Sequence, residues 1–594
     1  MMKDTKRALN YFAVNLKKYW KGLLFVVVLT VISTWFQVKA PTYMGNAITD
    51  LSKYLAKYAN PATRGQASLQ YFYNALWALL LFYGMNVATM LISSLWTSRI
   101  NAMSTNRMRI GLFGKLQRMT IRYFDRHQDG KILSLFTSDL DNIFNAMNQA
   151  IFELISQTAL YIGTVWIMFS LNVKMALATV ASTPLVIIVA LFIVRKARYN
   201  IDLQQEEIGR LNGYINEQIN GEKIIITNGL QKQSLAGFKE KNERVRRATF
   251  KGQLYSGLLF PLMQGLSLLN LAIVIAFGSW MVVNDNMEKA VGLGLIVMFV
   301  QYSQQYFQPI TQITSMFSML QLALTGAKRL ADVHLQAEEQ VNINGKELDG
   351  IKQGVELRDI RFGYDKDKEI LHGLNIHVEK GKMIALVGPT GSGKTTVMNL
   401  LNRFYDVNDG QILFDGTDIN KIKLKELRKN VGIVLQDSVL FTGTIAENIK
   451  FGKPHATDVE MISAAKQAHI HDFIKSLPAG YATKISDADA LFSTGQKQLI
   501  SIARTILTNP PFLILDEATS NVDMVTEEKI QKAMDNVIAG RTSFVIAHRL
   551  KTIIKANDII VLKDGNIIEE GSHQQLLKEK GFYYELYTNQ MVFE

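Results

Sequence analysis

Hydrophobic residues are concentrated in six stretches, each long enough to form a helix that crosses a lipid bilayer. They cover residues 22–44, 71–96, 154–171, 175–194, 258–283 and 291–310. A helix needs about 20 residues, most of them apolar, to span the hydrocarbon layer. The first stretch begins too far from the N-terminus, and continues too long, to be a cleaved signal peptide. The pattern therefore predicts six retained membrane-spanning helices.

The polar connections between these stretches predict how the chain is oriented. Residues 171–175 and 284–289 are short turns, whereas the connections before residue 154 and before residue 258 are long, helical in pattern and rich in lysine and arginine. Positive residues beside spans mark the cytoplasmic side, so both long connections and both termini are expected in the cytosol. Turn signals at residues 124–130 and 222–227 are expected at the tips of two cytosolic helical hairpins.

Composition narrows the class of protein. A chain of 594 residues is too long for one core, and a hydrophobic fraction of 48% suits a protein that lies partly in lipid. The absence of cysteine excludes disulfides, thiolate metal sites and cysteine nucleophiles. The net charge of +13 lies largely beside the apolar stretches, so it indicates membrane orientation, and no nucleic-acid partner is predicted.

A change of pattern after the sixth span predicts a second domain. Residues 332–353 are polar and lose the helical periodicity, and from residue 354 short β-rich runs alternate with helical ones, as in α/β domains. We expect a membrane domain at residues 1–331, a linker at 332–353 and a second domain at 354–594. The predicted fold class is an α-helical membrane domain with long cytosolic extensions, followed by an α/β domain, whose chemistry the next motifs identify as that of a P-loop nucleotide-binding domain.

The run "GPTGSGKT" carries the clearest chemistry. It follows the apolar strand "MIALV" and precedes the helical run "TVMNLLNRF", which is the context that a P-loop requires and a chance glycine-rich turn lacks. Backbone amides of such a loop surround phosphates at the positive end of the following helix. Lys394 is expected to reach the β- and γ-phosphates of ATP, and the Thr395 hydroxyl to bind Mg²⁺. The predicted phosphate-binding residues are Gly388, Pro389, Thr390, Gly391, Ser392, Gly393, Lys394, Thr395 and Thr396.

A second apolar strand, "PFLILDE", ends on two carboxylates. Asp516 is expected to hold Mg²⁺, partly through water, and Glu517 to orient and polarise the attacking water as the catalytic base. The alternative, a pair of solubilising charges, is disfavoured by the P-loop upstream.

These motifs, in this order and spacing, resemble the ATP-binding cassette (ABC) transporters, and the six spans with long cytosolic extensions resemble their exporter branch. The resemblance implies roles for four further residues. Tyr364 is similar to the aromatic residue that stacks on adenine, and Gln436 to the glutamine that approaches Mg²⁺ and the water. His548 resembles the switch histidine that contacts the γ-phosphate, and is expected to be catalytic. Asp523 closes "SNVD", which resembles the loop through which two such domains communicate.

The family's signature, close to Leu-Ser-Gly-Gly-Gln, faces the ATP held by the opposite domain of a dimer. Here the matching residues are Phe492, Ser493, Thr494, Gly495 and Gln496. Ser493 is a good N-cap, but Thr494 replaces a glycine, and a β-branched residue resists positive φ and adds bulk near phosphate. Asp487 and Asp489 add negative charge nearby, which repels phosphate.

The altered signature predicts that the chain pairs with a second, different half-transporter, leaving one competent and one degenerate ATP site. The alternative is that threonine is tolerated and the chain forms a homodimer that exports lipids or peptides. A membrane sensor or channel gated by the ATPase is a third reading, but no charged rings along a pore are evident. The expected cargo is a hydrophobic small molecule exported across a bacterial cell membrane.

Substrate contacts are less well defined by the sequence. Glu153, Gln301, Gln304 and Gln305 are polar residues in or beside spans, where polar groups rarely face lipid. They are candidates to line a cavity, and hydrogen bonding between helices explains them equally well.

Overall fold

The structure is a computed structural model that describes residues 2–285, 287–365, 367–435, 438–485, 492–517, 522–547 and 550–591. The chain divides into two compact units. The first contains residues 1–117 and 128–336, and the second contains residues 118–127 and 337–594. The short segment 118–127, which follows the long helix α3 (Gln70–Leu116), thus belongs to the C-terminal unit.

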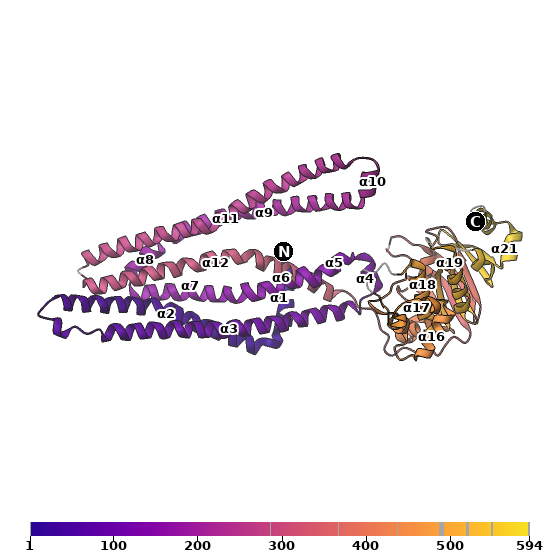
Figure 1. The fold of residues 1–594 in the computed structure, drawn as a ribbon, viewed down its shortest axis with the longest axis horizontal. Coiled ribbons are helices and arrows are strands. Elements are labelled where there is room, and N and C mark those ends of the chain that lie inside the picture. Colours follow the sequence, from indigo (N-terminus) through magenta and orange to yellow (C-terminus); the bar gives the residue numbers. More distant parts are fainter. Residues whose placement is uncertain are drawn as a thin grey trace. The chain divides into compact units, whose positions relative to one another are not determined.

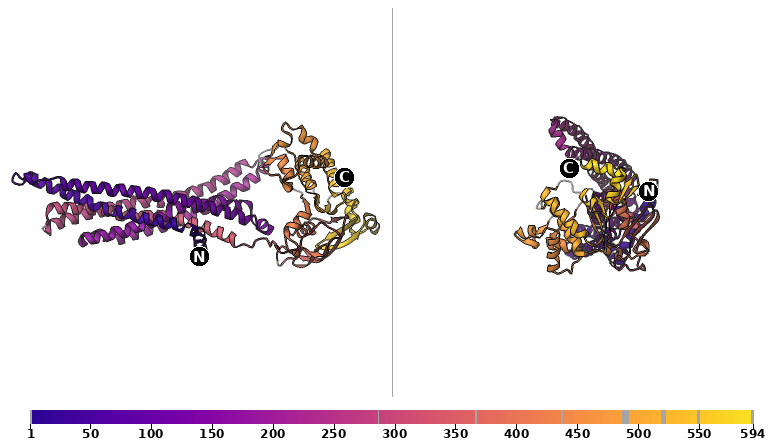
Figure 2. Two further views of the ribbon diagram at one scale, coloured as in Figure 1. Left: turned by 90° about the horizontal axis from the view of Figure 1, so that it is seen from below. Right: turned by 90° about the vertical axis from the view of Figure 1, so that its right-hand side faces the viewer.

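The first unit is built of long helices, several of which run side by side as antiparallel pairs (Figures 1 and 2). The helix α9 pairs with α11, and the six-residue helix α10 joins them, so residues 222–227 form the tip that the sequence predicts. Its helices are α1 Met2–Leu16, α2 Trp20–Ala59, α3 Gln70–Leu116, α5 Asp129–Ser134, α6 Leu140–Ala146, α7 Phe152–Leu171, α8 Val173–Val180, α9 Thr183–Asn220, α10 Glu222–Thr227, α11 Gln231–Asn284 and α12 Lys289–Leu335.

Five helical segments of the described chain are long and apolar enough to cross a membrane. They are Lys6–Ala59, Arg64–Leu116, Asp129–Leu171, Val173–Asn220 and Gln231–Asn284, and they include the first five predicted spans. The sixth, within α12, does not reach the same apolar content because several glutamines follow Val300. It is nonetheless one continuous helix of 47 residues.

Close packing between α2 and α12 depends on two glycines. A Cβ atom on Gly45 would lie 2.7 Å from the backbone oxygen of Gly294, and one on Gly294 would lie 2.6 Å from that of Gly45. Small residues at such a crossing let helix backbones approach closely in lipid. The Thr30 and Thr34 hydroxyls in α2 donate to carbonyls one turn earlier, Val26 and Thr30, and so satisfy their own hydrogen bonds.

The second unit has a central six-stranded sheet with the strand order β12-β11-β3-β10-β9-β6. All neighbouring strands are parallel except β12, which pairs antiparallel with β11 at one edge. The strands are β3 Met383–Val387, β6 Val431–Val434, β9 Phe512–Glu517, β10 Thr542–Ala547, β11 Asp558–Lys563 and β12 Asn566–Gly571. The β3 strand is buried at all five positions, as its unbroken apolar sequence predicts.

A second, antiparallel sheet has the order β2-β1-β4-β5, and a short β7-β8 pair lies apart from both. Its strands are β1 Gly354–Phe362, β2 Leu371–Glu379, β4 Asp409–Phe414 and β5 Thr417–Asp418, and the short pair is β7 Gly443–Thr444 and β8 Lys484–Ile485. One buried apolar cluster joins the two sheets around α13, and another joins the central sheet to α16, α18 and α19. The helices of this unit are α4 Ile121–Arg126, α13 Lys394–Leu401, α14 Leu424–Asn430, α15 Ile445–Ile449, α16 Asp458–Gln467, α17 His471–Ser476, α18 Thr494–Thr508, α19 Met524–Ile538, α20 Leu550–Ile554, α21 His573–Glu579 and α22 Phe582–Met591.

Candidate nucleotide site

The P-loop residues connect β3 to α13, as the sequence predicts. Gly391 and Gly393 adopt φ values of +86° and +106°, which L side chains rarely adopt, and Gly393 is the N-cap of α13. At Gly388 the constraint is steric, since a Cβ atom would lie 2.1 Å from the Leu562 carbonyl oxygen. These glycines therefore allow the loop to turn tightly into the N-terminus of α13, where the helix dipole favours an anion.

Two buried polar side chains belong to this loop. The Lys394 ammonium donates to the Gly388 and Pro389 carbonyls at 2.7 and 2.9 Å. Burial lowers the pKa of Lys394, and the negative charge of Asp516 opposes that shift. The Ser392 side chain is 2% exposed, and its hydroxyl has no hydrogen-bond partner within the described residues. An unpartnered buried hydroxyl beside a lysine suits a phosphate ligand, which supplies acceptors to both.

The predicted magnesium ligands lie at the same edge of the sheet. Asp516 is half-buried near the end of β9, and Thr395 is exposed in the first turn of α13. Glu517 is the last residue of β9, where its backbone pairs in register with Ala547 of β10. The side chain of Glu517 is outside the described residues. Because the carboxyl ends of parallel strands meet at one edge, β3, β9 and β10 bring the P-loop and these carboxylates together.

Several predicted residues fall in parts of the chain that the structure does not describe. These are Gln436, Asp487, Asp489, Ser520 and His548. The strand before His548 is described, and β10 ends at Ala547 beside the end of β9.

Magnesium would be held here by few protein atoms. No group of three or more histidine or acidic side chains that could hold a metal occurs among the described residues. The donors at this edge are the Thr395 hydroxyl and the Asp516 carboxylate, hard oxygen ligands of the kind that Mg²⁺ takes together with phosphate oxygens and water. These residues therefore fit a magnesium ion that is bound with a nucleotide.

Tyr364 lies close to the P-loop helix. Its hydroxyl accepts from the Asn399 side chain at 3.0 Å and donates to Thr396 at 3.4 Å. Its ring makes an edge contact with the ring of Tyr405, with centroids 4.9 Å apart. The ring is half-buried, so part of its surface is available to a nucleotide base.

A direct link that no local sequence pattern indicates joins Tyr364 to α4. The Tyr405 hydroxyl donates to the Asp125 carboxylate. Arg126 forms an ion pair with Asp365 at 2.7 Å and also donates to the Tyr364 carbonyl at 3.4 Å. The residues around the predicted adenine contact thus hold α4 within the C-terminal unit.

The observed position of α4 differs from the predicted one. The sequence places a tip element at residues 124–130, but α4 covers Ile121–Arg126 and ends before His127. The Thr120 residue before it has an extended backbone, which starts the helix earlier than the glycine signal at Gly130 suggests.

The signature residues form the start of α18. The Ser493 hydroxyl accepts from the Gln496 amide at 3.3 Å, and the Gln496 side chain accepts from the Ser493 amide at 2.9 Å, which completes a capping box. Gly495 is buried, and a Cβ atom there would lie 2.4 Å from the Thr526 side chain of α19. A glycine is therefore required at this position by packing.

The expectation of backbone strain at Thr494 is wrong. Thr494 is the first residue of α18 and is absent from the described residues with positive φ. A threonine adopts this helical backbone without strain, so the φ argument against it fails. Its side chain is exposed at the helix N-terminus, and only the argument from added bulk remains.

Asp523 caps the next helix. Its carboxylate accepts from the Thr526 amide at 2.9 Å, and this hydrogen bond lowers the pKa of Asp523. The predicted communication loop therefore ends in a fixed N-cap at α19.

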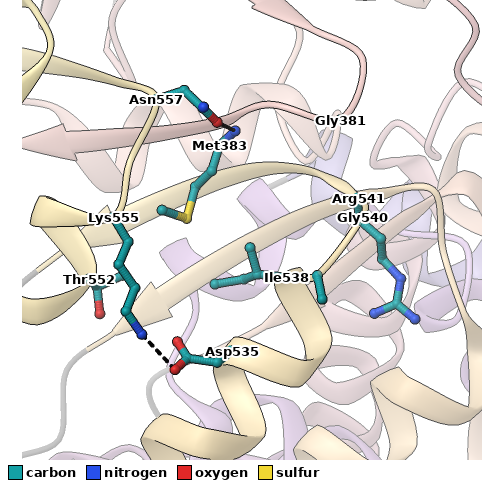
Figure 3. A pocket seen from close by; sticks show the side chains of 10 residues that line it. Gly381, Met383, Asp535, Ile538, Gly540, Arg541, Thr552, Lys555 and Asn557 are labelled. Carbon is teal, nitrogen blue, oxygen red and sulfur yellow. Dashed lines mark hydrogen bonds and ion pairs between the residues drawn. The ribbon is translucent and has the colours of Figure 1, made fainter.

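A separate cavity of about 310 Å³ lies at the opposite edge of the central sheet (Figure 3). Lys555 forms an ion pair with Asp535 on one side of it, and the Asn557 side chain accepts from the Met383 amide. Met383 begins β3 and Arg541 precedes β10, so this cavity faces the amino ends of the strands. Ligands of open α/β sheets bind at the carboxyl ends, so this cavity is not the nucleotide site.

The polar residues of the membrane domain divide into two groups. Glu153 accepts from Gln157 of the same helix at 2.6 Å, a local pair that explains its position. Gln301, Gln304 and Gln305 line a cavity between α2, α11 and α12. Hydrogen bonding within the protein therefore explains Glu153, whereas the three glutamines line a cavity, as the other interpretation predicts.

Comparison with known families matches both units. The family described as "ABC transporter transmembrane region" matches residues 23–310, and that described as "ABC transporter" matches residues 371–520. The chain is similar in structure to a bacterial Atm1-family ABC exporter with ATP bound, with a TM-score of 0.75 and 29% identity. That match covers 97% of this chain and 98% of the other.

Curated relatives align along most of the chain. An uncharacterized ABC transporter ATP-binding protein of Bacillus subtilis, YfiC, is 39% identical over 590 residues, which are 99% of this chain and 95% of the relative. A fatty acid ABC transporter ATP-binding/permease protein of Mycobacterium bovis is 38% identical, over 81% of this chain and 75% of the relative. An ATP-dependent lipid A-core flippase of Syntrophus aciditrophicus is 34% identical, over 81% and 80%.

Proposed function

Given that the chain belongs to the ABC transporters as an exporter-type half-transporter, we propose that it forms one half of a heterodimer that exports hydrophobic or amphipathic compounds across a bacterial cell membrane. Coupling of ATP hydrolysis to transport follows from the family. The heterodimer and the class of cargo are the parts that we add. One observation supports the heterodimer. The chain has a P-loop with the buried polar side chains Ser392 and Lys394, and it also has a signature in which Thr494 replaces a glycine.

The residues at the carboxyl ends of β3, β9 and β10 have different roles in ATP hydrolysis. Lys394 and Ser392 bind and orient the phosphates of ATP, and the backbone amides at the start of α13 stabilise charge that develops on the γ-phosphate. Magnesium, when bound through Thr395 and Asp516, supplies neutralising charge. We assign Glu517 to orienting the attacking water and His548 to holding the γ-phosphate. Tyr364 holds the adenine by stacking.

Two short helices transmit the closing of the nucleotide-binding domains. The α4 helix contacts Tyr405 and Asp365 through Asp125 and Arg126. The α10 helix exposes Ile224 and Ile226, with 66% and 55% of their surface accessible. Exposed isoleucines on a six-residue tip suit contact with another protein surface, and we assign that surface to a nucleotide-binding domain of the dimer.

A homodimeric lipid or peptide exporter is the second candidate. The relaxed helical backbone of Thr494 favours it, because a tolerated threonine leaves the site that it faces competent. The bulk of the exposed Thr494 side chain favours the heterodimer, since a side chain at this helix terminus keeps the γ-phosphate of the opposite site at a distance.

One experiment tests the catalytic assignment. Glu517→Gln in the purified exporter is expected to lower ATP turnover by about 10²–10⁴-fold, the usual contribution of a general base, while ATP binding is retained. Glu570→Gln, an exposed carboxylate of β12, is the matched control and is expected to keep normal turnover. Retained turnover in Glu517→Gln contradicts the assignment.

A second experiment tests the dimer type. The chain purified alone is expected to show low ATPase activity, which rises when Thr494→Gly restores the glycine of the signature. High activity of the unaltered lone chain, or no response to Thr494→Gly, contradicts the heterodimer proposal.

A further inference from the structure

The membrane domain contains a cavity of about 470 Å³ whose wall is dominated by glutamine. Three helices line it: α2, α11 and α12. The glutamines are Gln37 of α2, Gln264 of α11, and Gln301, Gln304, Gln305 and Gln308 of α12. We call this space the glutamine chamber. Gln312, one helical turn further along α12, also lines it.

The α12 glutamines form a stripe on one face of the helix. Positions 301, 304, 305, 308 and 312 follow the spacing of three and four residues that places side chains above one another. From 301 to 312 the stripe extends about 16 Å along the helix axis at 1.5 Å per residue. A polar stripe of this length inside a predicted span needs a polar environment, since amides facing lipid are costly.

On the opposite face of α12, buried polar side chains form hydrogen bonds with neighbouring helices. Tyr302 is fully buried and donates to the Val38 carbonyl at 3.0 Å. Ser303 is fully buried and accepts from Asn270 at 2.9 Å. Tyr306, also fully buried, shares hydrogen bonds with Thr183 and Tyr161. The polar groups on this face are thus satisfied by neighbouring helices.

Three glutamines of this face, Gln304, Gln305 and Gln308, are not fully paired within the protein. Gln305 donates to the Gln37 carbonyl at 3.2 Å, but its own side-chain oxygen is buried without a partner among the described residues. Gln304 and Gln308 are exposed to the chamber, and neither makes a side-chain hydrogen bond to any other described residue. The side-chain amides of Gln304, Gln305 and Gln308 therefore offer hydrogen-bond donors and acceptors to a molecule in the chamber.

The chamber combines these amides with apolar side chains and contains no charge. Phe260, Met263, Leu268 and Phe307 complete much of the wall, and none of the described lining residues is Asp, Glu, Lys or Arg. An ion that enters such a space loses part of its hydration and gains no opposite charge, so its entry is unfavourable. A neutral molecule with amide or hydroxyl groups gains hydrogen bonds without that cost.

From this wall we infer that the glutamine chamber binds the cargo and selects uncharged amphipathic molecules with several amide or hydroxyl groups. Anionic fatty acids and cationic amphiphiles are disfavoured. This inference rests on the proposed function, since it names the cargo class of the proposed exporter. The volume of the chamber is within the range of small-molecule sites.

Binding of a matched pair of ligands tests the inference. The probes are an acylated dipeptide amide, which is neutral, and the same acylated dipeptide as its free acid, which carries one negative charge at pH 7. Affinity is measured on the purified exporter in nanodiscs of zwitterionic lipid, so that membrane charge does not concentrate either probe. The amide is expected to bind at least tenfold more tightly than the acid.

Four variants, one of them a control, separate the chamber from nonspecific effects. Gln301→Leu and Gln305→Leu are each expected to weaken binding of the amide by about 2–12-fold, the usual range for one hydrogen bond. Gln205→Leu, an exposed glutamine of α9 outside the chamber, is the matched control and is expected to leave binding unchanged. Gln304→Lys is expected to tighten binding of the acid, a gain that a misfolded protein cannot show.

Equal affinity for the amide and the acid overturns the inference, as does an effect of Gln301→Leu no larger than that of Gln205→Leu. The ATPase assay on the same nanodiscs keeps the two proposals distinct. An exporter that hydrolyses ATP but prefers the acid contradicts the chamber inference alone, whereas an inactive complex contradicts the proposed function.

Discussion

Removal of the Tyr405 hydroxyl should weaken the attachment of α4 to the nucleotide-binding domain. Tyr405→Phe keeps the aromatic ring, which makes edge contacts with Phe362 and Tyr364 and lies 5.5 Å from the Arg122 guanidinium. It removes only the hydrogen bond to the Asp125 carboxylate. Burial raises the pKa of Tyr405, and the hydrogen bond to Asp125 and the charge of Asp125 raise it further, so the phenol keeps its proton and acts as the donor at neutral pH.

The structure indicates how large the effect should be. A hydrogen bond to a charged group contributes about 1.5–3 kcal/mol, which corresponds to a change of about 10–150-fold in the equilibrium that docks α4. The Arg126–Asp365 ion pair is a weaker second link, because its side chains are 55% and 75% exposed and such pairs contribute about 0.2–1 kcal/mol. Tyr405→Phe should therefore exceed Asp365→Asn in effect.

The assay is ATP turnover of the purified exporter with and without cargo, together with ATP affinity. Tyr405→Phe is expected to abolish most of the stimulation by cargo and to leave ATP affinity within about twofold, since the ring contact with Tyr364 remains. Asp365→Asn serves as the control and should keep most of the stimulation. Full stimulation in Tyr405→Phe, or an equal loss in Asp365→Asn, refutes this account of the link.

Three other expectations follow from local geometry. Gly495→Ala should lower the melting temperature of the exporter, because its Cβ atom would lie 2.4 Å from the Thr526 side chain, and overpacking of this kind costs about 1–3 kcal/mol; an unchanged melting temperature contradicts the packing role. Arg329→Met should lower the free energy of unfolding in chemical denaturation by about 3–5 kcal/mol, because it leaves the Asp139 carboxylate, which is 8% exposed, without its partner. Asp139→Asn should cost less, because the Arg329 side chain that it leaves unpaired is 42% exposed and can hydrate. Equal losses in the two variants contradict this asymmetry. The stabilisation that the Asp523 N-cap gives to α19 should depend on pH. The pKa of Asp523 is lowered in the folded state, so the carboxylate stabilises the fold at neutral pH, and this stabilisation is lost below about pH 4 as the carboxylate is protonated. The difference in denaturation midpoint between the unaltered protein and Asp523→Ala should therefore shrink below that pH.

Local sequence patterns predicted the elements whose structure is set within a few residues. The P-loop lies between a buried strand and a helix because its glycines permit φ values of +86° and +106° and its lysine folds back on the loop. Residues 222–227 form a helix between two turns, as the glycine signals around them predict. The α-helical membrane domain followed by an α/β domain is confirmed by both family matches and by the likeness to the solved exporter.

Features that depend on contacts distant in sequence were not predicted. Tyr405 and Asp125 are 280 residues apart, and nothing near either of them marks the pair. The strain argument at Thr494 failed for a different, local reason. It assigned a backbone conformation from the residue type that the family usually has, whereas the capping box between Ser493 and Gln496 already places Thr494 in the helix.

The sixth predicted span illustrates a conflict between two demands on one helix. Helix α12 must lie in lipid on one side, which favours apolar residues, and it lines the glutamine chamber on another, which requires polar ones. Mean hydropathy averages over both faces, so the stripe from Gln301 to Gln312 lowers it below that of the other five spans. A helix that lacks apolar content on a single face is therefore better explained by a polar chamber than by a position outside the membrane. The same reasoning connects this deficit to function, because the residues responsible for it are those that the cargo would contact.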